Sequence, residues 1–167
     1  MYFVRTASER DLDKVSALLG EAFRAAYAAL HGEAKVNELI AHLFSPSALQ
    51  ARLARKNAEF LVADNGKHIG GIGYAAMSDD MSKTVMLHLL YVRPALHRQG
   101  IGREIFAELE TCFPDAEMMR LEVEPMNATA IAFYRAHGFA DVGRNENDGP
   151  GQSGIATLIL EKPLETQ

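Results

Sequence analysis

The segment whose residue types most clearly suit a chemical role contains two glycines and two arginines in six consecutive residues. These are Arg98, Gln99, Gly100, Ile101, Gly102 and Arg103. They follow an apolar, strand-like stretch at 85–92 and precede a helical pattern. The first turn of a helix presents unbonded backbone N–H groups and a positive dipole end, and both attract anions. The glycines would let a diphosphate approach the main chain, and the arginines could add charge-assisted hydrogen bonds. The segment predicts a phosphate-bearing cofactor, with an ordinary strand-to-helix turn as the alternative.

The other glycine, cysteine and histidine patterns indicate structural roles and no further catalytic or metal site. Gly71-Ile72-Gly73 is similar to part of a dinucleotide fingerprint, but no helix follows it, so it indicates a bulge or close packing of a strand. Cys112 is the only cysteine, which excludes an intrachain disulfide, and its helical apolar neighbours favour a core position over a nucleophile. The six histidines show no metal-ligand spacing, so we expect no metal.

Length and composition are those of a single domain covering residues 1–167. The net charge of −5 argues against a general binder of nucleic acid or of anionic membranes, since both reward a basic surface. The first residues lack the apolar segment of a signal peptide, and no apolar run is long enough to span a bilayer. We therefore expect a cytoplasmic protein without a nucleic-acid or membrane partner.

The first third of the chain predicts a strand at residues 2–6 followed by helices. Ser8 and Asp11 have the spacing of a capping box, and Ser45-Pro46 has the residue types of a helix start. Three helices are expected here, over residues 8–30, 36–43 and 45–56. They form an insertion between the first and second strands.

The rest of the chain alternates strands and helices. Asn65-Gly66 predicts a hairpin, and Asn127 and Gly138 predict the ends of a short helix. Strands are expected over residues 59–63, 67–77, 84–92, 118–123, 139–144 and 155–160. Loop 145–154 is polar and glycine-rich, and we expect it to be mobile.

These elements predict an α+β fold with α/β/α layers. Its central sheet would be mixed, mostly antiparallel and of about seven strands, with helices on both faces. The strand–helix–strand unit over residues 84–123 is expected to be a right-handed parallel crossover.

Two motifs in this chain resemble those of the GNAT superfamily of N-acetyltransferases. The first joins Leu89-Leu90-Tyr91-Val92-Arg93-Pro94 to 98–102, and the second runs from Asn127 through 130–134 to Gly138-Phe139. The order of elements agrees over almost the whole chain. One residue departs from the pattern, because the phosphate motif of the family usually opens with Gln or Arg and His97 stands there. We expect this change to be tolerated, since the loop binds mainly through main-chain groups.

The resemblance implies a site for acetyl-CoA as cosubstrate. Its pantetheine arm would pair with the backbone of Leu90 and Val92, close to that of Tyr91, where two strands of the sheet splay apart. Its pyrophosphate would lie on the N–H groups of residues 98–103. Asn127 and Tyr134 would approach the arm and the sulfur, and a main-chain N–H at or beside Leu90 would stabilise the oxyanion.

Tyr134 is the candidate acid that this resemblance implies. A phenol with a pKa of about 10 is protonated at neutral pH, so it carries a proton that a leaving thiolate can take, although the transfer to a thiol with a pKa of about 8.5 is uphill by about 1.5 pKa units. Tyr134 follows Asn127 by seven residues, which places both on roughly one helix face. The alternative is a core aromatic residue whose hydroxyl group is hydrogen-bonded.

His88 is the candidate base, because an alkylammonium is almost fully protonated at neutral pH. It interrupts an apolar strand, and alternation places it on the same face as Leu90. Some members of the family that acetylate arylalkylamines have a histidine at the corresponding position. The alternatives are a hydrogen-bonded core histidine, and a water chain that serves as the route for the proton.

We interpret the chain as an enzyme that transfers an acetyl group from acetyl-CoA to a primary amine by direct attack in a ternary complex. The insertion and the acidic loops, with Asp79, Asp80, Glu146 and Asp148, favour a small amine or a polyamine. A peptide N-terminus or a protein lysine is the alternative acceptor, and a non-catalytic acyl-CoA-binding module is the alternative class. Many members of the family are dimers, so a homodimer is possible.

Overall fold

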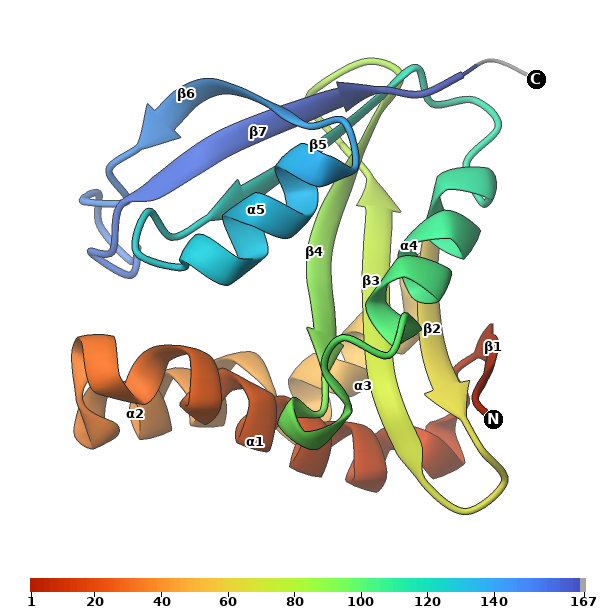
Figure 1. The fold of residues 1–167 in the computed structure, drawn as a ribbon. Coiled ribbons are helices and arrows are strands. Elements are labelled where there is room, and N and C mark those ends of the chain that lie inside the picture. The colour runs from red at the N-terminus through yellow and green to blue at the C-terminus, as the bar shows by residue number, and fades with distance from the viewer. Residues whose placement is uncertain (166–167) are drawn as a thin grey trace. The chain divides into compact units, whose positions relative to one another are not determined.

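The structure is a computed structural model, which describes residues 1–165. The strands are β1 (Phe3–Thr6), β2 (Ala58–Asp64), β3 (Ile69–Met77), β4 (Thr84–Val92), β5 (Met118–Val123), β6 (Ala140–Asn145) and β7 (Thr157–Pro163). They form a seven-stranded mixed sheet in the order β1-β2-β3-β4-β5-β7-β6 (Figure 1). The α+β class and the strand count expected from the sequence are therefore confirmed.

Five α-helices and two short 3-10 helices accompany the strands in the described part of the chain. The α-helices are α1 (Leu12–His31), α2 (Glu33–Leu43), α3 (Pro46–Ala54), α4 (Ile101–Thr111) and α5 (Ala128–Ala136), and the 3-10 helices are η1 (Glu9–Asp11) and η2 (Pro94–Leu96). The insertion of three helices between the first two strands is confirmed.

The chain forms two compact units that alternate along the sequence. The first unit comprises residues 1–76 and 89–113, and the second comprises residues 77–88 and the chain from Pro114 onward. Strand β4 contributes its first half to the second unit and its second half to the first. One domain over the whole chain stays a prediction.

In the first unit, β3 carries apolar side chains toward α1 and α3. Ile72 and Tyr74 are fully or almost fully buried in a cluster that includes Val15 of α1 and Leu49 of α3. Successive side chains of a strand point to opposite faces, so Gly71 and Gly73 face the other way.

Helix α4 covers that other face of β3 at close range. A Cβ atom on Gly71 would lie 2.9 Å from side-chain atoms of Ile101 and Ile105, and one on Gly73 would lie 2.5 Å from Ile105 and 3.0 Å from Leu109. The glycines thus allow α4 to pack directly on the backbone of the strand. Helices lie on both faces of the sheet in this unit, as expected, and the close packing inferred for these glycines is confirmed.

In the second unit, β5 lies between β4 and β7. It pairs in parallel with Thr84–Met86 of β4 and antiparallel with β7, which in turn pairs with β6. The parallel direction expected for the crossover at residues 84–123 is therefore confirmed.

Two strands begin two residues later than the sequence pattern predicts, and side-chain hydrogen bonds explain both. The side-chain oxygen Oδ1 of Asn65 accepts from the N–H groups of Lys67 and His68, so these residues belong to the turn and β3 begins at Ile69. The Asn147 amide donates to the Ile155 carbonyl at 2.8 Å, so the loop extends past this residue and β7 begins at Thr157. The base of the loop is thereby held, and its mobility stays a prediction.

The capping box at the start of the first helix is present but opens a 3-10 turn. The Ser8 N–H donates to Asp11 Oδ2 at 2.8 Å, and η1 precedes α1. The Arg5 guanidinium lies between Asp11 and Asp64, at 2.8 and 3.0 Å. Its hydrogen bond, reinforced by the Ser8 N–H, holds the pKa of Asp11 well below its usual range. This network joins β1, η1 and the end of β2.

Among residues 1–165, no helix combines the length and the apolar character that crossing a bilayer requires. A cytoplasmic location stays a prediction.

Replacing Gly73 by alanine should destabilise the protein by about 1–3 kcal/mol, because the new methyl group would overlap Ile105 and force α4 away from β3. Urea unfolding followed by circular dichroism measures this change. The matched control is Gly143→Ala on β6, where a Cβ atom would make an ordinary 3.7 Å contact with Ile159. Equal unfolding midpoints for the two variants would contradict the packing account.

Candidate functional site

The backbone between η2 and α4 has the alternating conformation of an anion-binding nest. The φ angle is +66° at Arg98 and +85° at Gly100, and it is not positive at Gln99 between them. Such alternation turns successive N–H groups toward one concave side. Arg98 is not a glycine, so its left-handed conformation costs about 1–2 kcal/mol and is a strain that this loop maintains.

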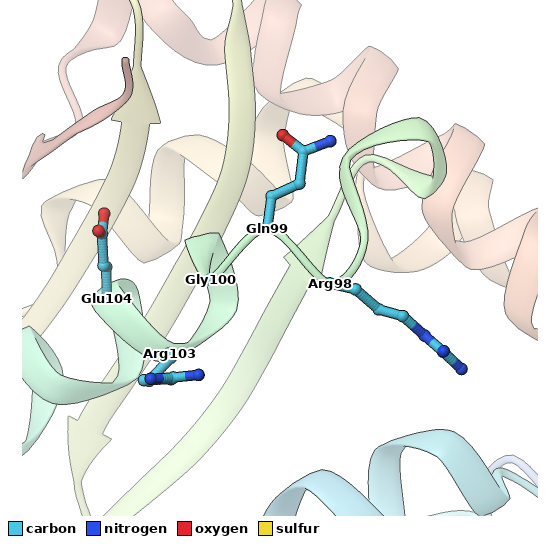
Figure 2. Close-up of a pocket in the computed structure, with 5 residues that line it drawn as sticks. All are labelled: Arg98, Gln99, Gly100, Arg103 and Glu104. Atoms are coloured by element: carbon cyan, nitrogen blue, oxygen red, sulfur yellow. The ribbon is translucent and has the colours of Figure 1, made fainter.

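A cavity of about 420 Å³ opens at this loop in the first unit, and its lining residues are Arg98, Gln99, Gly100, Arg103 and Glu104. A Cβ atom on Gly100 would meet no atom within 4 Å, so the main chain here is open to a ligand. Figure 2 shows Arg98 extending away from the loop, while Gln99 of the loop and Glu104 of α4 project in another direction. The side chains therefore leave the turn at Gly100 uncovered.

The start of α4 adds unbonded donors to this cavity. The N–H of Glu104 makes the first helical hydrogen bond, to the Gly100 carbonyl, so the amides of residues 101–103 precede the helical ladder. Two guanidinium groups and one carboxylate line the same space, which leaves a net positive charge. A diphosphate fits this donor set by charge and by access. The residues predicted from the sequence to bind a diphosphate, 98–103, thus form one loop and helix start in the first unit.

Arg93 holds the end of β4 in place before the loop. Its N–H donates to the Gly70 carbonyl at 2.9 Å, and its guanidinium donates to the Ile69 carbonyl at 3.2 Å and to Glu21 of α1 at 2.6 Å. The strand that would pair with a pantetheine arm is therefore tied to β3 and to α1.

The residues predicted to pair with the arm, Leu90 and Val92, lie in the second half of β4. Their side chains share one face of the strand, and that of Tyr91 lies on the other. Leu90 and Val92 are half-buried. The Tyr91 ring packs against the apolar cluster of the first unit, 6.4 Å from the Phe23 ring. A contact of its backbone with the cofactor stays a prediction.

In the second unit, β4 and β5 separate just before His88. Their parallel register ends at Met86 with Arg120, although both strands continue. Two residues further along the two strands lie His88 and Glu122, on the same faces as Met86 and Arg120, and both side chains are exposed. His88 is therefore not a core histidine. Glu122, which the sequence pattern did not single out, accepts hydrogen bonds from Thr157 Oγ1 at 2.5 Å and from Asn145 Nδ2 at 3.1 Å.

Tyr134 and Asn127 lie on α5 of the second unit. The Tyr134 ring makes edge contacts with Phe133 and Phe139, with centroids 5.6 and 5.5 Å apart. Asn127 caps the helix, because its side-chain oxygen accepts from the Ala130 N–H at 3.2 Å. The cap explains why asparagine suits this position, and a contact with the cofactor stays a prediction.

Cys112 corrects one sequence-based interpretation, because it lies just past the end of α4 and is half-buried rather than in the core. Burial raises the pKa of its thiol to about 11, and Glu59 and Glu108 add to this shift. A thiol with this pKa is almost fully protonated at neutral pH and is a poor nucleophile. Among residues 1–165, no group of three or more His, Cys, Asp and Glu side chains could hold a metal ion.

Comparison with known proteins identifies a family and several relatives. The sequence profile of the acetyltransferase (GNAT) domain matches residues 27–150. The chain is similar to an N-alpha-acetyltransferase, RimI, of Mycobacterium tuberculosis, with 34% identity over 116 residues that cover 64% of this chain and 71% of the relative. It is also similar to an IAA acetyltransferase of Azospirillum brasilense, with 32% identity over 67% of this chain and 72% of the relative.

Several solved structures share the fold over nearly the whole chain, and one of them contains a bound ligand. This is the PaiA N-acetyltransferase of Thermoplasma acidophilum in complex with coenzyme A, with a TM-score of 0.83 and 22% identity. The match covers 98% of this chain and 99% of that one.

Proposed function

The chain belongs to the GNAT family of acetyltransferases, and from that premise we propose that it acetylates the amino group of a small amine or a polyamine. It is an acetyl-CoA-dependent N-acetyltransferase that acts on an amine-type substrate. The observation that supports the cosubstrate is the open nest at Gly100 beneath the start of α4, with its net positive lining. Such a donor set suits a diphosphate, because its N–H groups and its charge both favour an anion.

The acceptor proposal rests on the acidic loops of the second unit. Asp79, Asp80 and Asp148 are exposed carboxylates on the loops that follow β3 and β6. Glu146 lies on the same loop as Asp148 and pairs with Arg144 at 2.7 Å. Exposed carboxylates attract a polycation more strongly than a singly charged peptide N-terminus, and salt screens this attraction.

A peptide N-terminus is the second candidate acceptor. The similarity to an N-alpha-acetyltransferase at 34% identity favours it. A non-catalytic acyl-CoA-binding module is disfavoured by the acetyltransferase family and relatives. A homodimer stays a prediction.

In the proposed reaction, the residues of this chain bind the cosubstrate and move two protons. The main chain of residues 98–103 would hold the diphosphate, and the backbone of Leu90 and Val92 would pair with the arm. A base takes a proton from the acceptor ammonium, the free amine attacks the thioester carbonyl, and the C–S bond breaks as Tyr134 donates a proton to the departing thiolate. The nitrogen then releases its second proton to solvent, which also reprotonates Tyr134. No covalent enzyme intermediate is required, and the protonated thiol of Cys112 would not provide one.

Two exposed groups beside the split between β4 and β5 are candidates for the base. His88 carries an imidazole, the side-chain type that most often relays protons at neutral pH. Glu122 is the corresponding residue of β5 if the β4–β5 register is extended by two residues, and hydrogen bonds from Thr157 and Asn145 orient its carboxylate. We propose His88 as the base, with Glu122 as the alternative.

A panel of acceptors tests the proposed substrate class. Release of CoA thiol should be at least about tenfold faster, as kcat/KM, with spermidine or putrescine than with a short peptide that has a free N-terminus, because the acidic loops favour the higher charge. The preference should shrink at high salt. Activity confined to peptides would overturn the acceptor proposal, and no thiol release with any amine would contradict the amine-acetylation account itself.

Replacing Tyr134 by phenylalanine should lower kcat by about a hundredfold or more, because the leaving thiolate then lacks its proton donor. The dissociation constant for CoA should change by less than about twofold, since only the hydroxyl group is removed. Steady-state kinetics and isothermal titration calorimetry measure the two effects. Tyr2→Phe is the matched control, and turnover at the same level in both variants would exclude Tyr134 as the acid.

The pH dependence of kcat/KM distinguishes the two candidate bases. In His88→Gln, the fall in kcat/KM toward acid pH should disappear together with most of the activity, because the titrating base is gone. In Glu122→Gln, the fall in kcat/KM toward acid pH (the acid limb of the profile) should remain. The reverse pattern would assign the base to Glu122, and an unchanged limb in both variants would indicate a water route that ends at another residue.

A further inference from the structure

His97 stands where the phosphate motif of the family usually has Gln or Arg, and its side chain has a defined contact. The ring Nε2 lies 3.0 Å from the carbonyl oxygen of Val92, the last residue of β4. A carbonyl oxygen only accepts hydrogen bonds, so the ring nitrogen must carry the proton and donate it. The side chain thus bridges the five residues that connect β4 to the loop.

This bridge closes a compact turn with main-chain support. The Leu96 N–H donates to the Arg93 carbonyl at 2.8 Å, and the His97 N–H donates to the Pro94 carbonyl at 3.3 Å. The Arg93 N–H is itself anchored to Gly70 of β3 at 2.9 Å. The next residue, Arg98, has the strained left-handed backbone that begins the nest. His97 therefore lies between an anchored strand end and a strained loop.

We propose that His97 is a positioning residue that couples the arm-binding end of β4 to the diphosphate-binding loop through a donated hydrogen bond. The inference rests on the proposed function, because it concerns binding of the same cosubstrate. The Val92 carbonyl has a second lone pair, so the bridge leaves one acceptor site for an amide of the arm. The feature that the position needs is a side-chain N–H donor of sufficient length.

This requirement explains why histidine can replace glutamine or arginine here. All three side chains carry N–H donors that are separated from Cα by several bonds, whereas their charges differ. A glutamine Nε2 group can occupy the place of the imidazole Nε2 atom. A leucine has similar bulk without a donor.

The test compares His97→Gln, His97→Leu and His97→Ala with the wild-type enzyme. Calorimetry with CoA should show that the leucine and alanine variants bind about three- to tenfold more weakly, since the contact is exposed and a single hydrogen bond is lost. The glutamine variant should bind within about twofold of wild type. KM for acetyl-CoA should rise in parallel, with kcat at saturation unchanged. His68→Leu in the β2–β3 turn is the control for loss of an exposed imidazole.

The outcomes separate this inference from the proposed function. Wild-type binding of CoA with no loss in the leucine and alanine variants overturns the role of His97 alone. Equal weakening in the glutamine and leucine variants also overturns it, because the donor would then be irrelevant. Absence of CoA binding by the wild-type enzyme overturns the proposed function and this role with it. Thermal unfolding of each variant verifies that it is folded, and the alanine variant serves if the leucine variant is not.

Discussion

The direct contact of α4 with the backbone of β3 determines where an anion can bind in the first unit. Gly71 and Gly73 remove the side chains that would hold the helix away, and Ile105 fills the space. At the other end of the connection, Arg93 ties the end of β4 to Gly70 of the same strand. The residues between β4 and α4 are therefore fixed at both ends to β3. With so little freedom, the chain adopts left-handed conformations at Arg98 and Gly100, and the main-chain N–H groups turn toward one side.

Binding through the main chain makes the site tolerant of side-chain changes. Amides supply the same donors whatever residue carries them, so the lining can combine Arg98 and Arg103 with a carboxylate at Glu104. The side chains that matter most are then those that shape the backbone. This view unites the glycines of β3, the ion pair of Arg93 with Glu21 and the bridge from His97. None of them needs to touch the ligand.

Local patterns were sufficient to predict most elements, because the signals act over a few residues. The Ser45 cap with Pro46, the Asn127 cap and the glycine at the start of α4 all lie where expected. The strand starts were wrong at residues 67 and 155, where side chains of Asn65 and Asn147 compete with the sheet for backbone groups. Cys112 was misplaced because a helical period does not show where the helix ends.

The site was predictable in its phosphate loop and not in its supporting contacts. A run such as residues 97–103 carries its chemistry in adjacent residues, whereas Glu122 becomes a candidate only once the β4–β5 register is known. The contact of His97 with Val92 depends on the turn between them, which no periodicity reports. The resemblance to the family identified Tyr134, and its role as an acid stays a prediction.

The most direct measurement of the central claim is a titration of the 15N-labelled enzyme with CoA, followed by the backbone amide resonances. If main-chain groups of the nest bind the diphosphate, the amides of residues 99–103 should show the largest shifts and should saturate together with the calorimetric isotherm. Saturation of binding with these amides unmoved, and the shifts located elsewhere, would contradict the account.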